Sequence, residues 1–242
     1  MARPRQPTTR RRVSKRSTDQ RLLDTAEALF ARRGLEGVSL REISAAAGSA
    51  NSVAVQYHFG TKQGLVEAIF ERRLTEIDGR RAELLNQAKR DGSLNDPRAM
   101  VAIMLRPTFE QQDSDGYHTY AAFLMRLYQG GSDDPRRLFS HLTPLTDYIN
   151  EHLRSLLPTQ PRRLFNTRIF AGSLMFLSML VAKDMRQRHT LQSVDDDVFF
   201  AECVNLVLSC LCAPVLPEVE AALPDFGERD VVVNEPDPSK RS

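Results

Sequence analysis

The sequence predicts an all-α protein in which a small N-terminal unit of three short helices is joined by one long helix to a larger helical domain. Two observations predict this class. Apolar residues recur at helical spacing through most of the chain after residue 16, and no convincing run of alternating strand-type residues occurs. With 242 residues, 41% of them hydrophobic, the chain can bury a core in a small domain and in a larger one.

The first helix is predicted to begin after Ser17 and to end at Gly34. Ser17 and Gln20 have the spacing of a capping box, in which each side chain satisfies the backbone N–H of the other residue. An apolar stripe at helical spacing follows, made of Leu22, Ala26, Leu29 and Phe30.

Residues 39–65 have the pattern of two short helices joined by a tight turn and followed by the start of a third. Ser39 and Glu42 form a second capping box, and Gly48 suits the left-handed position that ends the first of these helices. The second helix begins near residue 51 and mixes polar side chains with small apolar ones. This layout is that of a DNA-reading helix-turn-helix.

A long helix is predicted over residues 62–90, because apolar residues keep helical spacing until Asp91-Gly92 stops it. Further helices are predicted at residues 97–112, 116–129, 135–157, 161–188 and 195–212. The uncharged run 169–182 is shorter than the roughly 20 apolar residues that a bilayer requires, so we expect a buried helix and no membrane association. The Pro- and acid-rich residues 215–242 are expected to be disordered.

Charge divides the chain in two. Residues 1–90 hold 18 Lys and Arg against 10 Asp and Glu, whereas residues 91–242 hold 15 against 21. Residues 1–16 carry seven basic residues and no acidic one, with too little apolar content to fold alone, and are predicted to form a disordered basic arm. A basic first part is expected where only one domain approaches phosphate.

Tyr57-His58-Phe59 followed by Thr61-Lys62-Gln63-Gly64-Leu65 resembles the Y-H-F…K-x-x-L signature of the TetR/AcrR family of bacterial transcriptional regulators. The resemblance covers residues 17–75. It implies a DNA-binding domain over residues 17–64 and an effector-binding and dimerisation domain over residues 65–214. The segment from Gly48 to Phe59 is one residue longer than the commonest family pattern, so positions before Tyr57 carry over with a one-residue ambiguity.

Phosphate contacts are expected from Lys62 and Tyr57. A cation in the first turn of a helix opposes the helix dipole, and phosphate contact explains Lys62 there, the alternative being a solvated lysine. Tyr57 resembles the aromatic phosphate contact of the family, or it packs with its hydroxyl in water. His58 can bind a phosphate or stack within the domain. The arm is expected to contact the DNA backbone or minor groove, or to serve as a solubilising or targeting tail, through Arg10, Arg11, Arg12, Lys15 and Arg16.

Base contacts are expected from the second helix of the motif. An amide can make paired hydrogen bonds to adenine and a hydroxyl can serve either partner, so the candidates are Gln56, Ser52 and Asn51. Val53 can touch a thymine methyl or lie in the core. Arg41 can bind guanine or phosphate, or it lies on a solvated face.

The larger domain is expected to bind a small apolar effector and to form the dimer. Five residues are expected in the effector cavity: Met104, Phe123, Tyr128, Phe170 and Met175. The family resemblance implies that the last two helices form a four-helix interface with a second subunit, the alternative being burial within one subunit. The interface candidates are Phe176, Leu180, Phe199, Leu206 and Cys210.

Signs of catalysis are missing from the sequence. It has no GxSxG elbow, Gly-rich phosphate loop or HExxH motif, and its three cysteines lack the spacing of a zinc site. We expect no cofactor and no metal. The sequence therefore predicts a cytoplasmic, nucleoid-associated regulator, a repressor that binds a palindromic operator as a homodimer and is released by its effector. The alternative is an architectural DNA-binding protein, or an activator, without a small-molecule ligand.

Overall fold

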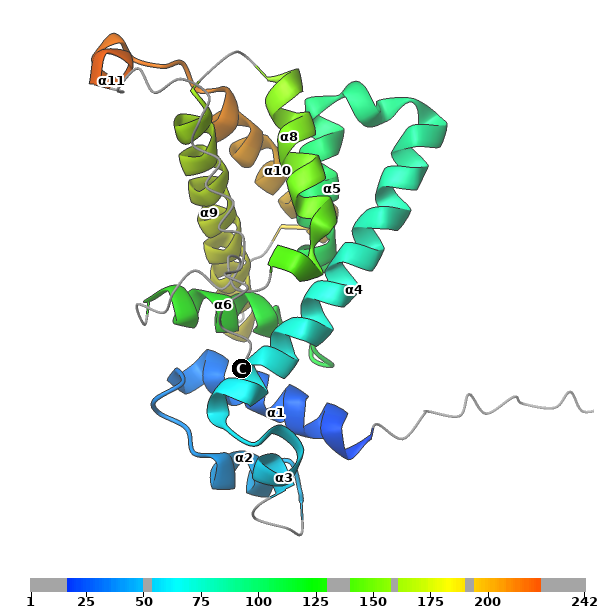
Figure 1. The fold of residues 1–242 in the computed structure, drawn as a ribbon, viewed down its shortest axis with the longest axis vertical. Helices are drawn as coiled ribbons and strands as arrows, with labels where there is room; N and C mark the ends of the chain where they lie inside the picture. Colours follow the sequence, from blue (N-terminus) through cyan, green and yellow to red (C-terminus); the bar gives the residue numbers. More distant parts are fainter. Residues whose placement is uncertain (1–16, 50–53, 130–139, 158–160, 190–193, 223–242) are drawn as a thin grey trace, which may run out of the picture.

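The computed structural model describes residues 17–49, 54–129, 140–157, 161–189 and 194–222, and in these residues it contains helices and no strand (Figure 1). The N-terminal helices are α1 (Thr18–Arg33), α2 (Leu40–Ala46), α3 (Ala54–Phe59) and the long α4 (Lys62–Asp91). The larger domain follows with η1 (Ser93–Asn95), α5 (Pro97–Glu110), α6 (Thr119–Gln129), η2 (Ser140–Leu142), α8 (Pro144–Leu156), α9 (Arg162–Arg188), α10 (Asp196–Cys212) and α11 (Pro217–Ala222). The all-α class predicted from the sequence is confirmed.

Both predicted capping boxes are present. The Ser17 hydroxyl accepts from the Gln20 N–H at 3.2 Å, and the Gln20 side chain accepts from the Ser17 N–H at 3.1 Å. Ser39 and Glu42 repeat this arrangement at 3.2 and 2.8 Å. The hydrogen bond from the Ser39 backbone, together with Arg33, lowers the pKa of the Glu42 carboxyl to about 2. These local bonds fix where α1 and α2 begin.

The N-terminal core contains more than the first three helices. Leu22, Phe30, Ile43 and Val55 are buried, and they share one apolar cluster with residues of α4 and α6. Phe123 of α6 is fully buried, and its ring stacks on that of Phe30 at 6.2 Å. The physical boundary between the domains therefore does not fall at residue 64, because α4 continues through it and α6 completes the first core (Figure 1).

Buried charges join α1 to α4. The carboxylate of Glu27 is 2% exposed and accepts hydrogen bonds from Arg72 at 3.2 Å and from Arg73 at 2.7 and 2.8 Å. Arg72 also pairs with Asp24 at 2.7 Å. On the other side of α1, Arg126 of α6 donates to the last carbonyl groups of that helix. The N-terminal helices are thus attached to the larger domain through both α4 and α6.

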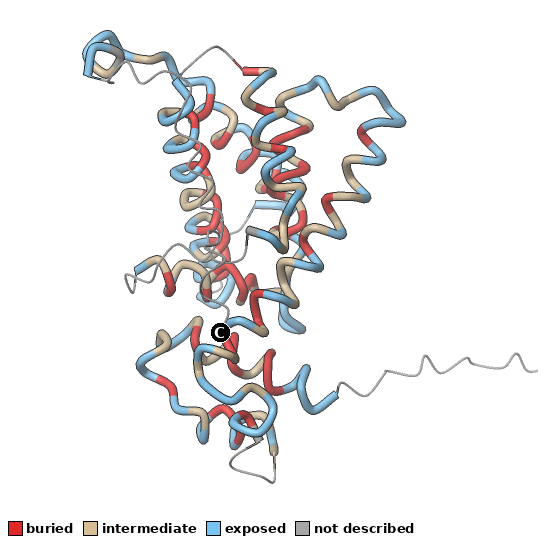
Figure 2. Tube along the Cα trace, viewed as in Figure 1, coloured by how far each residue is buried: buried red, intermediate tan, exposed pale blue. Residues whose placement is uncertain are grey.

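The larger domain buries its own core between α5, α8, α9 and α10 (Figure 2). Gly172 allows α9 to approach α10 closely, since a Cβ there would lie 3.2 Å from Val207. By length and composition α9 is the one helix among the described residues that could cross a membrane. It packs against α6 and α10, but only 33% of its most apolar stretch is buried within the single chain, so the expectation of a buried helix is met only in part.

Three predicted elements need correction. The helix expected from residue 116 begins only at Thr119, because the preceding turn is closed by Asp113, whose carboxylate accepts from the backbone of Tyr117 and from the Thr119 hydroxyl. The helix expected over residues 135–157 is interrupted, since α8 starts anew at Pro144, a residue without a backbone N–H. Within the tail expected to lack structure, Pro217–Ala222 is helical.

Candidate DNA-binding surface and ligand cavity

Helices α2 and α3 lie at the end of the molecule that is remote from α8 and α10 (Figure 1). Val55 anchors α3, since its side chain is fully buried and its backbone N–H donates to the hydroxyl of the buried Ser44 on α2 at 3.4 Å. The following residues Gln56 and Tyr57 are exposed, Tyr57 to 82%. An amide and an aromatic hydroxyl are therefore presented to solvent from a helix that is held in place by its partner.

Of the predicted DNA contacts outside α3 and α4, the structure describes Arg41 alone. Arg41 is exposed on α2, as a contact to DNA requires. Asn51, Ser52 and Val53 lie outside the described residues, as do the arm residues Arg10, Arg11, Arg12, Lys15 and Arg16.

His58 is tied to α1. Its Nδ1 lies 2.9 Å from the carboxylate of Asp19, and its ring meets that of Tyr57 edge-on at 5.2 Å. The negative charge of Asp19 disfavours a phosphate at this position. Of the two expectations for His58, the contact within the domain is the one that the structure contains.

Lys62 has a structural contact that the sequence analysis missed. Its ammonium donates to the backbone carbonyl of Leu35 at 2.8 Å and so joins the start of α4 to the turn after α1. The alternative of a purely solvated lysine is therefore wrong, since the ammonium bonds within the protein. An ammonium carries three N–H donors, and one is used here, so a phosphate contact remains open as a prediction.

A tight turn sets α3 against the start of α4. Gly60 adopts a positive φ of 69°, and the side chain of Thr61 caps α4 by accepting from the Gly64 N–H at 3.0 Å. At Gly64 a Cβ would collide with the backbone carbonyl of Phe59. The sequence marked Gly64 only as part of a signature, whereas the structure shows the close approach that requires glycine there.

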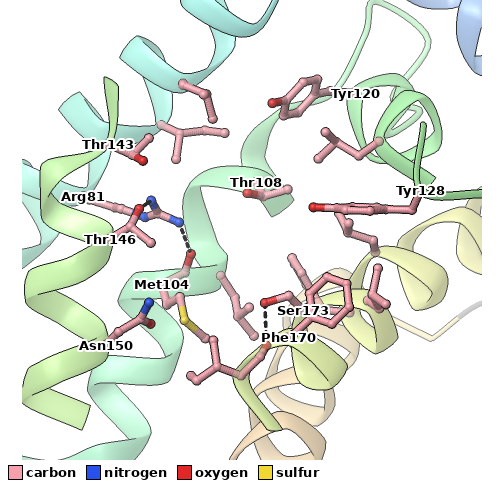
Figure 3. Close-up of a pocket in the computed structure, with 18 of the residues that line it drawn as sticks. Arg81, Met104, Thr108, Tyr120, Tyr128, Thr143, Thr146, Asn150, Phe170 and Ser173 are labelled. Carbon is pink, nitrogen blue, oxygen red and sulfur yellow. Dashed lines mark hydrogen bonds between the residues drawn. The ribbon is translucent and has the colours of Figure 1, made fainter. Parts of the chain in front are cut away.

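A cavity of about 890 Å³ lies between α4, α5, α6, α8 and α9 (Figure 3). Met104, Tyr128 and Phe170, which were predicted to line an effector cavity, lie in its wall. Phe123 and Met175 do not, and the expectation for them is corrected. Phe123 is fully buried in the N-terminal core, and Met175 packs against the core of the larger domain.

The cavity also has polar groups that the sequence analysis missed. They come from five helices and include Arg81, Thr108, Tyr120, Thr146, Asn150 and Ser173. Arg81 is only 8% exposed, and it donates to the hydroxyl of Thr146 at 2.6 Å and to the carbonyl of Met104 at 3.2 Å. Its position four residues after Ile77, on the apolar side of α4, is a sequence signal that could have identified it.

The dimer candidates separate into two groups. Phe176 and Leu180 are 2% and 0% exposed within the single chain, so they have no surface left for a partner, and the expectation for them is wrong. Phe199, Leu206 and Cys210 are only partly buried. Because α9 and α10 pack against each other, with Gly172 next to Val207, a partner would have to contact other sides of both helices.

The family match to known proteins lies in the N-terminal part of the chain. The model of the family described as "Bacterial regulatory proteins, tetR family" matches residues 22–69. The HTH-type transcriptional repressor KstR2 of Rhodococcus jostii is 31% identical over 93 residues, which are 38% of this chain and 42% of that protein. The HTH-type transcriptional regulatory protein RaaS of Mycobacterium tuberculosis is 29% identical over 136 residues, 56% of this chain and 57% of that protein.

The chain thus spans about half the length of these curated relatives. Among solved structures, the probable transcriptional regulatory protein RHA5900 aligns over its whole length with 81% of this chain, at 20% identity and a TM-score of 0.53. At this identity the likeness concerns the fold alone, namely a helix-turn-helix unit followed by a helical domain.

Proposed function

Because the chain belongs to the TetR family of bacterial regulatory proteins, we propose that it is a sequence-specific transcriptional repressor that binds a palindromic operator as a homodimer and is released by a small-molecule effector. The observation that carries this proposal is the position of α3. It is anchored on α2 through Val55, and it exposes Gln56 and Tyr57 at one end of the molecule.

Different residues of this surface contact the bases and the phosphates of the DNA. Gln56 reads a base edge in the major groove, because a side-chain amide can pair with adenine through two hydrogen bonds. Tyr57 and Lys62 contact phosphates and fix the position of α3, and Arg41 adds a contact from α2. Asn51, Ser52 and Val53, together with the basic arm, complete the surface in this proposal.

The homodimer uses the sides of α9 and α10 that point away from the core. Met185 on α9 is 55% exposed and Val198 on α10 is 58% exposed, and both are apolar. A second subunit across these sides places one recognition helix on each half of a two-fold symmetric site.

Effector control follows from residues that line the cavity and also lie in the N-terminal core. Phe70 and Ile77 of α4 and Tyr120 of α6 lie in the cavity wall and also in the N-terminal core. A ligand that repacks any of them therefore acts on the core that supports α3. Both α4 and α6 carry the change, and the distance between the two recognition helices of the dimer shifts with it.

Selection of DNA from a random pool by the full chain tests the proposal. The expected result is an enriched site with dyad symmetry and half-sites about 10 bp, or a multiple of that, apart. Gln56→Ala should weaken binding to this site by on the order of 1–3 kcal/mol and leave binding to unrelated DNA unchanged. A broad footprint without sequence preference would support an architectural DNA-binding protein instead.

A further inference from the structure

The cavity contains a buried cation without an anionic partner. Arg81 donates two hydrogen bonds, and both acceptors, the Thr146 hydroxyl and the Met104 carbonyl, are neutral. Its Nε is buried and has no hydrogen-bond partner. Within the described residues no carboxylate forms an ion pair with it. A guanidinium has five N–H donors, so most of its capacity is unused.

Neither Asp78 nor Asp147, acidic residues of the surrounding helices, forms an ion pair with this arginine. Asp78, one turn earlier on α4, acts at longer range and accepts a hydrogen bond from the backbone of Leu145. Asp147 lies in the cavity wall but is exposed to solvent. Burial lowers the pKa of the Arg81 guanidinium to about 10, so the group keeps its positive charge at neutral pH.

Other buried polar atoms in the cavity wall also lack a partner. They are the hydroxyl of Tyr120, which is 1% exposed, and the side-chain oxygen of Asn150. Figure 3 shows Arg81, Thr146 and Asn150 at one side of the cavity, with Tyr120, Tyr128 and Phe170 at the other. Buried polar atoms of a folded protein are rarely left unpaired unless a water or a ligand completes them.

We propose that the effector is an amphipathic carboxylate, whose charged group is bound by Arg81 and whose apolar part lies against Met104, Tyr128 and Phe170. The planar guanidinium matches a carboxylate through two parallel hydrogen bonds, here from Nε and a terminal nitrogen. The apolar side chains bury the hydrocarbon part of the ligand. This inference rests on the proposed function for the cavity and adds the chemical class of its ligand.

Calorimetric titration of the full chain at pH 7 tests the class with matched probes. Octanoate and phenylbutyrate are compared with their neutral amides, octanamide and phenylbutyramide, which keep the apolar part and remove the charge. Each carboxylate should bind at least about 10-fold more tightly than its amide, because a hydrogen bond to a charged group contributes more than one between neutral groups. Equal affinities within both pairs, or no binding by any of the four probes, would overturn the proposal.

The Arg81→Met variant locates the charged group. It should lose at least about 10-fold in affinity for octanoate while its affinity for octanamide changes by less than about 3-fold. Arg80→Met is the control, since Arg80 is the neighbouring residue but pairs with Glu83 and Glu110 on the surface, and it should leave both affinities unchanged. If Arg81→Met lost both probes equally, Arg81 would have a structural role, and the assignment would be wrong.

Operator release is measured separately by fluorescence anisotropy of labelled operator. Octanoate that binds through Arg81 but leaves the operator bound would contradict the proposed effector control and leave the ligand class standing. Release of the operator by octanamide as readily as by octanoate would contradict the ligand class and leave the effector control standing.

Discussion

Buried arginines in the two halves of α4 have different partners. In the N-terminal half, Arg72 and Arg73 both donate to the buried carboxylate of Glu27, so positive and negative groups meet directly. In the C-terminal half, Arg81 is buried to a similar degree, yet it meets only neutral oxygens. The first group is an internal joint between helices, whereas Arg81 has no carboxylate in contact among the described residues and, in our proposal, receives one from the effector.

The largest change in stability is expected when the joint between Glu27 and its two arginines is broken. Glu27→Ala removes the buried carboxylate that Arg72 and Arg73 share. Arg72 keeps Asp24 and Arg73 keeps Glu76, so the free energy of unfolding should fall by about 3 kcal/mol in a urea titration, the low end for a broken buried pair. The control Glu83→Ala removes only a surface pair with Arg80 and should cost less than about 1 kcal/mol. Equal losses in the two variants would mean that the joint is not a special feature of this half of α4.

A second pair of variants compares two glycines of the same helix. Gly64→Ala forces a Cβ against the Phe59 carbonyl at the turn between α3 and α4, so it should destabilise the protein by about 1–3 kcal/mol and displace α3. Gly79→Ala meets no atom within 4 Å and should stabilise the helix by about 0.5–1 kcal/mol. The thermal unfolding and the operator affinity of both variants are measured. An unchanged operator affinity in Gly64→Ala would contradict the role of this turn in positioning α3.

Substitutions at the two ends of α4 should differ in their effect on the salt dependence of DNA binding. Lys62→Ala removes the bond to the Leu35 carbonyl, worth about 1 kcal/mol, and a phosphate contact, so the slope of log K against log salt should fall by about one. Lys89→Ala, an exposed change at the far end of the helix, should leave the slope as it is. A normal salt slope in Lys62→Ala would restrict this lysine to its structural contact.

The smallest effect concerns pH. The folded protein holds the pKa of Glu42 at about 2, below its ordinary value of 4.5, so its contribution to stability is complete above about pH 4.5 and is lost as the pH falls toward 2. Glu42→Gln should therefore be less stable than the natural protein at neutral pH, with the difference shrinking through this window. A difference that stayed constant between pH 6 and 2 would contradict the ionised capping box.

Features set by neighbouring residues could be predicted from the sequence. The caps at Ser17 and Ser39 and the stop at Gly92 need only a few adjacent residues, and all three are present. Pro144 is an equally local signal, because proline favours the first turn of a helix, and α8 begins there. Phe123 was expected in the effector cavity and Phe176 at the dimer interface, whereas each lies in a core of the single chain. Which core a residue joins depends on contacts far apart in the chain.

The polar part of the cavity could be predicted least. Arg81 is separated in sequence from Tyr120 and Asn150, and no local pattern announces that they face one space. The contact of Lys62 with Leu35, across 27 residues, was hidden for the same reason.

The central claim, that the cavity and the DNA-binding surface are coupled through α4 and α6, is tested most directly by one calorimetric experiment. Octanoate is titrated into the full chain with and without saturating operator DNA. Coupling through α4 and α6 should make the operator weaken octanoate binding by about 5- to 150-fold, the range of a typical coupling free energy, and octanoate should weaken operator binding by the same factor. Equal affinities for octanoate in the two titrations would contradict it.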